Sequence, residues 1–406
     1  MNKSLKIVND PIYGFIRIPT DFVFQVIEHS YFQRLRRIRQ LGMTHLVYPG
    51  ANHTRFHHAL GAMHLMMEAV DVLRSKGHQI TPAEAEGAYL AILLHDIGHG
   101  PFSHALEDSI VTGIRHEEIS EIFMDRLNHE YKGKLEVAIA IFRDLYPKKF
   151  LHQLVSSQLD MDRLDYLNRD SFFAGVSEGV ISNDRIIKML EVHDDQLCIE
   201  EKGIYSIEKF IVARRLMYWQ VYLHKTVVSA ECLLINILKK AKDLVRHGEQ
   251  LQATPALSLF LHREYSKLDF IRDEKVLDFF AELDDSDVSA ALKLWCRHPD
   301  PALSDLSKRM LNRKLFRIQL QREPFSPEYE KEMKDNLMNR FNLSERDLEY
   351  YFVKGTMVNN AYSSGEDRIN ILLKDGSVKD IAEAADSLNI KVLSEAVEKH
   401  YICSPK

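Results

Sequence analysis

Cysteine is scarce in this chain. Its four cysteines, at positions 198, 232, 296 and 403, are far apart and form no CxxC pair. Structural disulfides and a zinc site built from thiolates are therefore not expected. Apolar residues make up 45% of the 406 residues and charged residues 28%, which is the composition of a soluble globular protein with a large core.

Long apolar segments, internal repeats and low-complexity stretches are also missing. The N-terminus lacks the apolar core of a secretory signal. The run 227–238 contains Ser229, Glu231 and Asn236 and is too short to cross a bilayer. We therefore expect a cytoplasmic protein without a membrane partner. The formal net charge of −6 argues against broad coating of nucleic acid, so nucleic-acid binding is not expected as the main role.

Apolar periodicity predicts a mainly α protein. The exceptions are two short strands within 5–18, around a turn at 9–11, and a β-hairpin at 369–381 with an Asp-Gly turn. We expect a helical body over 1–345, with its functional core at about 50–180, and a small α+β subdomain over 346–406. Helices are predicted over 21–41, from about Arg55, over 83–96, from about His116, over 151–170 and, as the longest, over 206–247.

The stretch 88–104, AYLAILLHDIGHGPFSH, carries the strongest chemical signal. An apolar helix ends at His95-Asp96 and is followed by Gly98, Gly100 and Pro101, which do not continue a helix easily. A buried carboxylate at such a helix end needs a partner or a metal ion. The simpler interpretation of a lone His-Asp pair is a helix end with satisfied polar groups.

Two other predicted helices add polar side chains to apolar faces. His58 shares a face with Leu65, and Arg55 lies one turn earlier, an arrangement that suits an anion between Arg55 and His58. Asp162 interrupts the apolar stripe of 151–170. A satisfied core histidine and a wetter helix are the ordinary interpretations of these two residues.

Together these helices present two imidazoles and two carboxylates. His58, His95, Asp96 and Asp162 form a mixed nitrogen and oxygen set that suits one Mn, Fe, Mg, Ni or Zn ion, with positions open for water and substrate. A single ion is expected because no second cluster is evident in the sequence. His99, His104 and His116 remain for proton transfer.

Two basic stretches are candidates for phosphate binding. Arg214, Tyr218, Tyr222 and Lys225 fall on one face of the longest predicted helix and fit a nucleotide-phosphate wall, although a solvated face is the usual explanation for such charges. The arginines of 34–39 predict a solvated helix face or an anion site on an oligomer surface.

The combined motifs resemble those of the HD-domain metal-dependent phosphohydrolases. Within that family, the chain is similar to the dNTP triphosphohydrolase branch, which includes the sterile-alpha-motif and HD-domain enzyme and bacterial relatives. The resemblance is strong over residues 1 to about 240 and looser beyond. It is carried by KIVNDPIYG (6–14), QRLRRIRQLG (33–42), TRFHHALG (54–61), LLHDIGHGPFSH (93–104), RHE (115–117), DMDRLDYLNRD (160–170) and the stripe 214–225.

The resemblance implies the helical HD-domain fold and a role for each matching residue. Metal ligation falls to His58, His95, Asp96 and Asp162. His104 would assist at the scissile phosphate, with Glu107 orienting it and His116 nearby. Arg55, Arg163, Arg214 and Tyr222 would hold phosphates, Gln40 and Leu41 would meet the deoxyribose, Asp170 its 3′-hydroxyl, and Tyr166 would close the pocket under the sugar.

The resemblance also implies a regulatory site. Lys6, Asn9, Glu28, Gln33 and Arg36 match the guanine-nucleotide activator site of that branch, which lies between subunits. A homo-oligomer, dimer or tetramer, activated by GTP or dGTP is therefore expected. The sequence departs from the branch at Glu107 and Glu28, where aspartate is usual, at Arg163, where lysine is usual, and at His57, which replaces an acidic residue.

We interpret the chain as a metal-dependent phosphohydrolase that converts dNTPs to deoxynucleoside and triphosphate. The alternatives are a nucleotidase or phosphodiesterase of the same superfamily acting on another nucleotide, and a non-catalytic nucleotide-binding protein built on an inactive HD domain. The presence of all four ligand residues argues against the inactive domain.

Overall fold

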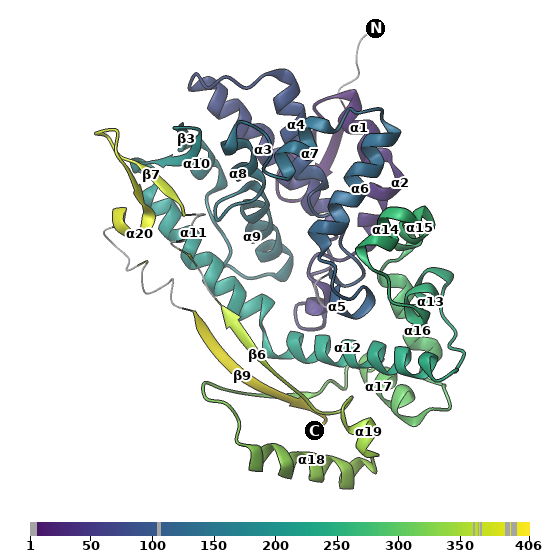
Figure 1. Cartoon of the computed structure of the whole chain (residues 1–406). Coiled ribbons are helices and arrows are strands. Elements are labelled where there is room, and N and C mark those ends of the chain that lie inside the picture. The colour runs from purple at the N-terminus through teal and green to yellow at the C-terminus, as the bar shows by residue number, and fades with distance from the viewer. Residues whose placement is uncertain are drawn as a thin grey trace.

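The computed structural model describes residues 6–103, 107–359, 362–363, 365, 368–385, 390 and 396–406. Helices dominate these residues, so the prediction of a mainly α protein is confirmed (Figure 1). The helices at the centre of the body are α3 (Arg55–Ser75), α4 (Pro82–Leu94) and α9 (Met161–Ala174), and α3 packs against both of the others. This central packing positions the site described below.

Other helices make up most of the remaining body. Those before residue 190 are α1 (Asp21–Glu28), α2 (Ser30–Gln33), α5 (Glu107–Ile110), α6 (His116–Glu130), α7 (Glu136–Phe142), α8 (Lys149–Val155) and α10 (Asn183–Lys188). Those after residue 250 are α13 (Pro255–His262), α14 (Lys267–Arg272), α15 (Glu274–Glu282), α16 (Asp285–Trp295), α17 (Pro301–Leu311), α18 (Pro327–Phe341), α19 (Glu345–Leu348) and α20 (Ile381–Ala384).

The predicted N-terminal strands form an antiparallel hairpin of β1 (Ile7–Asp10) and β2 (Gly14–Arg17), as expected. The prediction of one helix over 21–41 is wrong. The chain turns at His29, whose backbone is extended (φ −66°, ψ 141°) and whose ring accepts a hydrogen bond from the Tyr31 amide at 3.2 Å. Two 3-10 turns, η1 (Arg34–Arg37) and η2 (Gly42–Leu46), follow α2 and lead to the site.

Arg34, in η1, is fully buried and does not belong to a solvated face or an anion site. Its guanidinium donates to the carbonyl oxygens of Ile97 (3.0 Å) and His99 (2.8 Å), just after α4. It also donates to those of Phe280 (3.1 Å) and Leu283 (3.2 Å) near the end of α15. Burial lowers the pKa of Arg34 to about 9, and these carbonyls are what satisfy its donors. Arg34 therefore ties the loop after α4 to the C-terminal half of the body.

The longest predicted helix, 206–247, is two helices. α11 (Ile204–Met217) continues into a π-helical turn (Tyr218–Tyr222), in which the Leu223 amide donates to the Tyr218 carbonyl at 2.7 Å. α12 (Lys225–Arg246) then begins at His224, whose ring accepts from the Thr226 amide at 3.2 Å. The two helical segments turn by 54° relative to each other. The break separates Lys225 from the rest of the predicted stripe.

The strands of the C-terminal region pair with strands of the body. β3 (Leu190–His193), β4 (Gln196–Glu200), β7 (Asn370–Leu372) and β8 (Val378–Asp380) form one sheet in that order, and β4 and β7 are parallel. β7 and β8 are the predicted hairpin. β9 (Val397–Ser404) lies between β5 (Arg317–Gln321) and β6 (Val353–Asn359) in a second sheet. The boundary of a separate subdomain at residue 346 stays a prediction.

In the part of the chain that the structure describes, no single helix is both long and apolar enough to cross a membrane. The bent pair Glu201–Tyr222 and Lys225–Arg246 meets that test only when its two segments are taken together.

Replacing Arg34 by lysine should destabilise the fold, because one ammonium does not reach carbonyls on both sides of the guanidinium. We expect the Arg34→Lys protein to lose about 2–4 kcal/mol of unfolding free energy, measured by denaturant titration. Arg17, on the exposed side of β2, provides the matched control. Arg17→Lys should change stability by less than about 0.5 kcal/mol. Equal effects of the two variants would contradict a structural role for Arg34.

Candidate functional site

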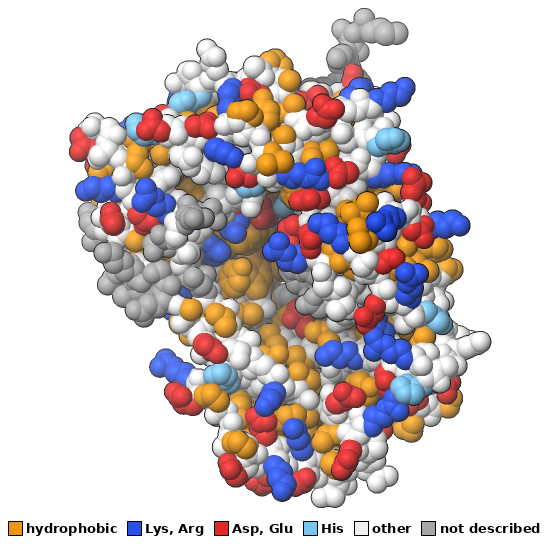
Figure 2. Space-filling model, in the orientation of Figure 1, with side chains coloured by type: hydrophobic (Ala, Val, Ile, Leu, Met, Phe, Trp, Pro, Cys, Tyr) orange, Lys and Arg blue, Asp and Glu red, His pale blue; other side chains and the backbone are white. Residues whose placement is uncertain are grey.

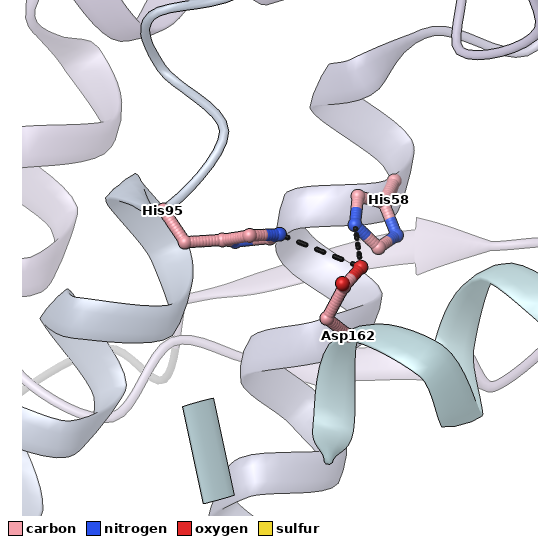
Figure 3. A group of neighbouring side chains, drawn as sticks. All are labelled: His58, His95 and Asp162. Carbon is pink, nitrogen blue, oxygen red and sulfur yellow. Dashed lines mark ion pairs between the residues drawn. The ribbon is translucent and has the colours of Figure 1, made fainter. Parts of the chain in front are cut away.

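Three helices bring two histidines and an aspartate together (Figure 3). His58 lies on α3, His95 directly follows α4, and Asp162 lies in the first turn of α9. The His58 Nε2 atom is 3.1 Å from Asp162 Oδ1, and the His95 Nε2 atom is 3.5 Å from the same oxygen. Asp160 caps α9 by accepting from the Arg163 amide at 2.7 Å, which fixes the helix start and the direction of Asp162.

The donor atoms of this group fit a divalent metal ion. The potential ligand atoms of His58, His95 and Asp162 lie within 4.8 Å of one another. Both Nε2 atoms are buried, and the described residues give neither of them a hydrogen bond. Buried imidazole nitrogens without hydrogen bonds, directed at one carboxylate, are what a metal ion would satisfy. Asp96 adds oxygens 3.5 Å from His95 Nε2 and 3.8 Å from His58 Nε2.

A chain of buried charges orients His58. Its Nδ1 is 2.8 Å from an oxygen of Asp165, and Asp165 in turn accepts from Arg169 at 2.8 and 2.9 Å. Arg169 also donates to Asp10, at the end of β1. Burial alone would lower the pKa of His58, but the neighbouring carboxylates of Asp162 and Asp165 outweigh it and raise the pKa to about 10. Such outer partners fix the tautomer and direction of a ligating imidazole.

Gly61 makes room for this chain of charges on the facing surface of α3. A Cβ at that position would lie 2.1 Å from Asp165 Oδ1 and 2.2 Å from an Arg169 nitrogen. Glycine is therefore required for α3 and α9 to approach with the Asp165–Arg169 pair between them.

A second group of potential ligands, which was not evident in the sequence, lies beside the first, while the expectation of a single ion stays a prediction. Oxygen and nitrogen atoms of Asp96, His99 and His116 also lie within 4.8 Å of one another, and the His99 and His116 rings stack with centroids 3.7 Å apart. Burial, followed by the charge of Arg55, holds the pKa of His99 well below its usual range. Sequence spacing gave no sign that α6 would carry His116 to this place.

Arg55 does not stand free beside His58. Its guanidinium pairs with Asp96, and its Nε donates to Ser103 Oγ at 2.9 Å. Arg55 is the first residue of α3, and its side chain contacts one of the potential metal ligands, Asp96. It lies between a potential ligand and the adjoining cavity.

A cavity of about 430 Å³ opens beside the metal group. Figure 2 shows the face of the molecule hollowed near its centre, with hydrophobic and charged side chains around the hollow. The cavity is lined by Gln40, Leu41, Gly42, Thr44, Arg55, Asp96, His99, Phe102, Ser103, His116, Asp162, Arg163, Tyr166, Asp170, Tyr218, Tyr222, Leu223 and Glu231. This volume is in the range of small-molecule and nucleotide sites.

Most residues that were expected to bind substrate lie on this wall. They are Arg55, Gln40, Leu41, Arg163, Tyr166, Asp170 and Tyr222. Arg214, on α11, is not part of the lining, and its Nε atom is buried without a hydrogen bond from the described residues. Lys225 is exposed at the start of α12. His104 and the side chain of Glu107 lie outside the described residues, so their expected roles stay predictions.

One wall of the cavity is aromatic and ends at Asp170. The rings of Tyr218 and Tyr222 meet edge to face at 5.2 Å, and Tyr166 lies 6.1 Å from Tyr222. Asp170 accepts from the Tyr222 hydroxyl at 2.9 Å and lies 2.7 Å from His53 Nε2. Because both oxygens are already positioned, Asp170 presents a fixed acceptor to the cavity.

The residues expected to bind an activator lie away from this cavity, and none of them lines it. Lys6 lies over the Phe24 ring at 3.4 Å, and Arg36 lies over the Phe56 ring at 3.6 Å. Gln33 accepts from Arg36 Nε at 2.8 Å. Asn9 is on β1 and Glu28 is exposed at the end of α1, so these residues come from neighbouring N-terminal elements.

Several site residues were not expected from the sequence. Asp165 and Arg169 gave a usable signal, since they are four residues apart on a predicted helix and Asp165 is one turn after Asp162. His53 and Ser103 gave none, because their partners are distant in the sequence. Glu231 was noted only as an interruption of an apolar run, yet it lines the cavity.

Comparisons with known proteins agree with this geometry. A family model described as the HD domain matches residues 55–170, and one described as the HD associated region matches residues 181–253. A solved phosphohydrolase from Bacteroides thetaiotaomicron is 52% identical and covers 99% of this chain and 100% of its own, with a TM-score of 0.95.

The curated relatives include uncharacterized proteins and proteins named as deoxynucleoside triphosphate triphosphohydrolases. An uncharacterized protein, YwfO, from Bacillus subtilis is 33% identical over 93% of this chain and 87% of its own length. A Dictyostelium discoideum protein named deoxynucleoside triphosphate triphosphohydrolase SAMHD1 homolog is 32% identical over 62% of this chain and 52% of its own length. The human protein named deoxynucleoside triphosphate triphosphohydrolase SAMHD1 is 27% identical over 60% of this chain and 45% of its own length. The match therefore spans about half the length of each of these two relatives.

Replacing Asp165 by asparagine should weaken metal binding without touching a proposed ligand. The amide removes the charge that holds the His58 ring and leaves Arg169 with one carboxylate partner. We expect the metal affinity of Asp165→Asn to fall about 10- to 100-fold, measured by titration of the apoprotein with Mn²⁺. Asp125→Asn, at an exposed end of a surface ion pair, should bind as the unaltered protein does. Unchanged affinity in Asp165→Asn would show that the charged chain does not position His58.

Glu231 should make stability depend on pH. Burial, with a smaller effect of neighbouring Cys232, raises its pKa from 4.5 to about 8. Between these pH values the unfolded chain ionises Glu231 while the folded protein keeps it protonated, so its contribution to folding becomes less favourable as pH rises. From pH 5 to pH 8, Glu231→Gln should gain roughly 2–4 kcal/mol of unfolding free energy relative to the unaltered protein. If the difference in unfolding free energy between Glu231→Gln and the unaltered protein is the same at pH 5 and at pH 8, the prediction is wrong.

Proposed function

Because this chain belongs to the HD-domain phosphohydrolases and resembles their dNTP triphosphohydrolase branch, we propose that it hydrolyses dNTPs to deoxynucleoside and inorganic triphosphate. The observation that carries the proposal is one cavity whose wall joins potential metal ligands, two arginines and a tyrosine-aspartate surface. The first two suit phosphates, and the last suits a sugar. The printed names of the Dictyostelium and human relatives support the same substrate class.

The proposed metal ligands are His58, His95, Asp96 and Asp162. A divalent ion held there would polarise a phosphoryl oxygen and lower the pKa of a bound water. Among the described residues, the buried Nε2 atoms that make no hydrogen bond support this assignment. Elemental analysis of the purified protein would identify the native ion among Mn, Fe, Mg, Ni and Zn.

The protein's own groups would act on the α-phosphate. In the proposed reaction, water attacks the α-phosphorus and the bond to the 5′-oxygen breaks. Arg55 would exchange part of its contact with Asp96 for a phosphate oxygen and neutralise charge in the transition state. His104, oriented by Glu107, would give a proton to the departing 5′-oxygen, with His116 and His99 close to the same centre. Positioning and charge neutralisation would supply most of the acceleration.

The rest of the nucleotide would lie along the cavity wall. Arg163 would hold the outer phosphates, supported from behind by its ion pair with Asp160, and Arg214 would add charge from α11. Asp170 would accept from the 3′-hydroxyl, since Tyr222 and His53 already fix its carboxylate. Tyr166 would close the floor under the sugar, and Gln40 and Leu41 would contact its edge.

We also propose a second nucleotide site outside the cavity. Lys6 and Arg36 would hold the phosphates of GTP or dGTP, and Asn9, Glu28 and Gln33 would recognise the base. Since none of these residues lines the cavity, their effect on turnover would come through assembly of a dimer or tetramer. A cytoplasmic location is part of the same proposal.

The proposal is tested by incubating Mn²⁺-loaded protein with each of the four dNTPs, with and without GTP. We expect chromatography to show deoxynucleoside and triphosphate, and sedimentation to show a larger species when GTP is present. Asp162→Ala should lose bound metal and at least 100-fold in rate, because it removes the oxygen that lies 3.1 Å from His58 Nε2 and 3.5 Å from His95 Nε2.

Other outcomes separate the alternatives. Release of orthophosphate or nucleoside monophosphate would indicate another nucleotide hydrolase of the same superfamily. Tight nucleotide binding without turnover would indicate a binding protein. Unchanged metal content in Asp162→Ala would remove Asp162 from the metal site.

A further inference from the structure

Glu231 differs from the other carboxylates of the cavity. It lies in the second turn of α12 and lines the same cavity as Asp96, Asp162 and Asp170. Asp96 pairs with Arg55, Asp162 with His58, and Asp170 with Tyr222 and His53. Among the residues that the structure describes, Glu231 has no hydrogen bond and no ion pair. Unlike Asp96, Asp162 and Asp170, Glu231 therefore has no partner among the described residues.

Leaving a carboxyl group in this position costs free energy. The surrounding protein solvates the charge of Glu231 poorly, and this desolvation raises its pKa to about 8. A glutamine or leucine of similar size would avoid that cost. Glu231 is half-buried and lines the cavity without a hydrogen bond from the described residues, so an occupant that donates hydrogen bonds to it would best explain the carboxyl group there.

The phosphates are not that occupant. The ionised form of Glu231 would repel phosphate. The two arginines of the cavity, Arg55 and Arg163, lie in the first turns of α3 and α9, where the proposed metal ligands also lie. Glu231 lies instead on α12, which packs against the turn Gly42–Leu46. Two other lining residues, Thr44 of that turn and Leu223 just before α12, carry no charge. This is the part of the wall that suits a nucleobase.

We propose that Glu231 recognises the nucleobase of the substrate and selects guanine. The inference rests on the proposed function, since it takes the cavity to hold a deoxynucleoside triphosphate. It concerns the catalytic cavity and is separate from the activator site proposed on the N-terminal elements.

The hydrogen-bonding edge of guanine explains the choice. Guanine presents two adjacent donors, the N1–H and the N2 amino group, and one carboxylate can accept from both through its two oxygens. Adenine and cytosine present one amino donor beside an acceptor. Thymine presents a single N–H between two carbonyl oxygens, which face a carboxylate unfavourably. Because the raised pKa keeps Glu231 protonated below about pH 8 in the free protein, guanine would bind with release of that proton, and its two donors would then stabilise the carboxylate.

The test compares dGTP with dTTP as competing substrates of the Mn²⁺-loaded full chain. The unaltered protein should show a higher kcat/KM for dGTP. Glu231→Gln has nearly the same shape but keeps one acceptor and turns an amide donor toward guanine. We expect it to lower the dGTP/dTTP ratio of kcat/KM about tenfold or more, mainly through KM for dGTP. Glu249→Gln, on the exposed segment after α12, should leave the ratio unchanged.

Each outcome decides between the two proposals. If no dNTP is turned over, the proposed function fails, and equilibrium binding of dGMP and dTMP to both proteins then tests Glu231 directly. If dNTPs are hydrolysed but the unaltered protein does not prefer dGTP, the guanine assignment is overturned without any variant. If Glu231→Gln keeps the ratio within twofold, Glu231 does not read the base. If Glu231→Gln fails to fold, Glu231→Asp replaces it in the test. This variant keeps the charge but has a shorter side chain, and we expect it to lose the preference for dGTP.

Discussion

The metal centre depends on the buried chain of charges from His58 through Asp165 and Arg169 to Asp10. Each member would be costly to bury alone, and each is satisfied by the next. Asp10 is also fixed, because its carboxylate accepts from the Ile12 and Tyr13 amides at 2.9 and 3.0 Å. The turn of the N-terminal hairpin therefore bears directly on the direction of a potential metal ligand on α3. In such a chain, the loss of one member leaves its neighbour unpaired, so the effect reaches the centre from a distance.

Helix ends and helix breaks supply most of the site. His95 directly follows α4, Asp162 is in the first turn of α9, and Tyr218 and Tyr222 belong to the π-helical turn that ends α11. Backbone groups are unpaired at such places, and the chain can turn side chains toward a common point. Arg34 fulfils the complementary role by donating to the carbonyls of the loop after α4, so the loop is held without regular structure. Rigid helices position this site, while their interruptions expose its chemistry.

The sequence was informative where one signal was local. The apolar run before His95-Asp96 and the helix start near Arg55 are local signals, and periodicity was enough to find them. Asp162 was also found, although the helix predicted over 151–170 is two helices, α8 and α9, with a break before Asp162. The breaks at His29 and at 218–224 were missed because helical propensity continues through both, and tertiary contacts decide the outcome. His116 was expected near the reacting phosphate, whereas His53 was missed because it joins the site through a contact with Asp170, which is distant in the sequence. Arg34 shows the same limit, since a basic run is expected to face solvent unless its carbonyl partners are known.

The polar atoms that receive no hydrogen bond from the described residues indicate the chemistry of the ligand. The Nε2 atoms of His58 and His95 face the metal group, and Arg163 Nε and Gln40 Oε1 are buried without hydrogen bonds from the described residues. Both of the latter side chains line the cavity, as does the unpaired carboxyl of Glu231. The histidine nitrogens suit a cation, Arg163 suits an anion, and the Gln40 oxygen and the Glu231 carboxyl suit hydrogen-bond donors, all in one cavity. A metal-bound nucleoside triphosphate offers all three in one molecule, because its phosphates, sugar and base differ in charge and in hydrogen-bonding character. The folded chain satisfies the buried charges that hold its shape and leaves unsatisfied those that its ligand would meet.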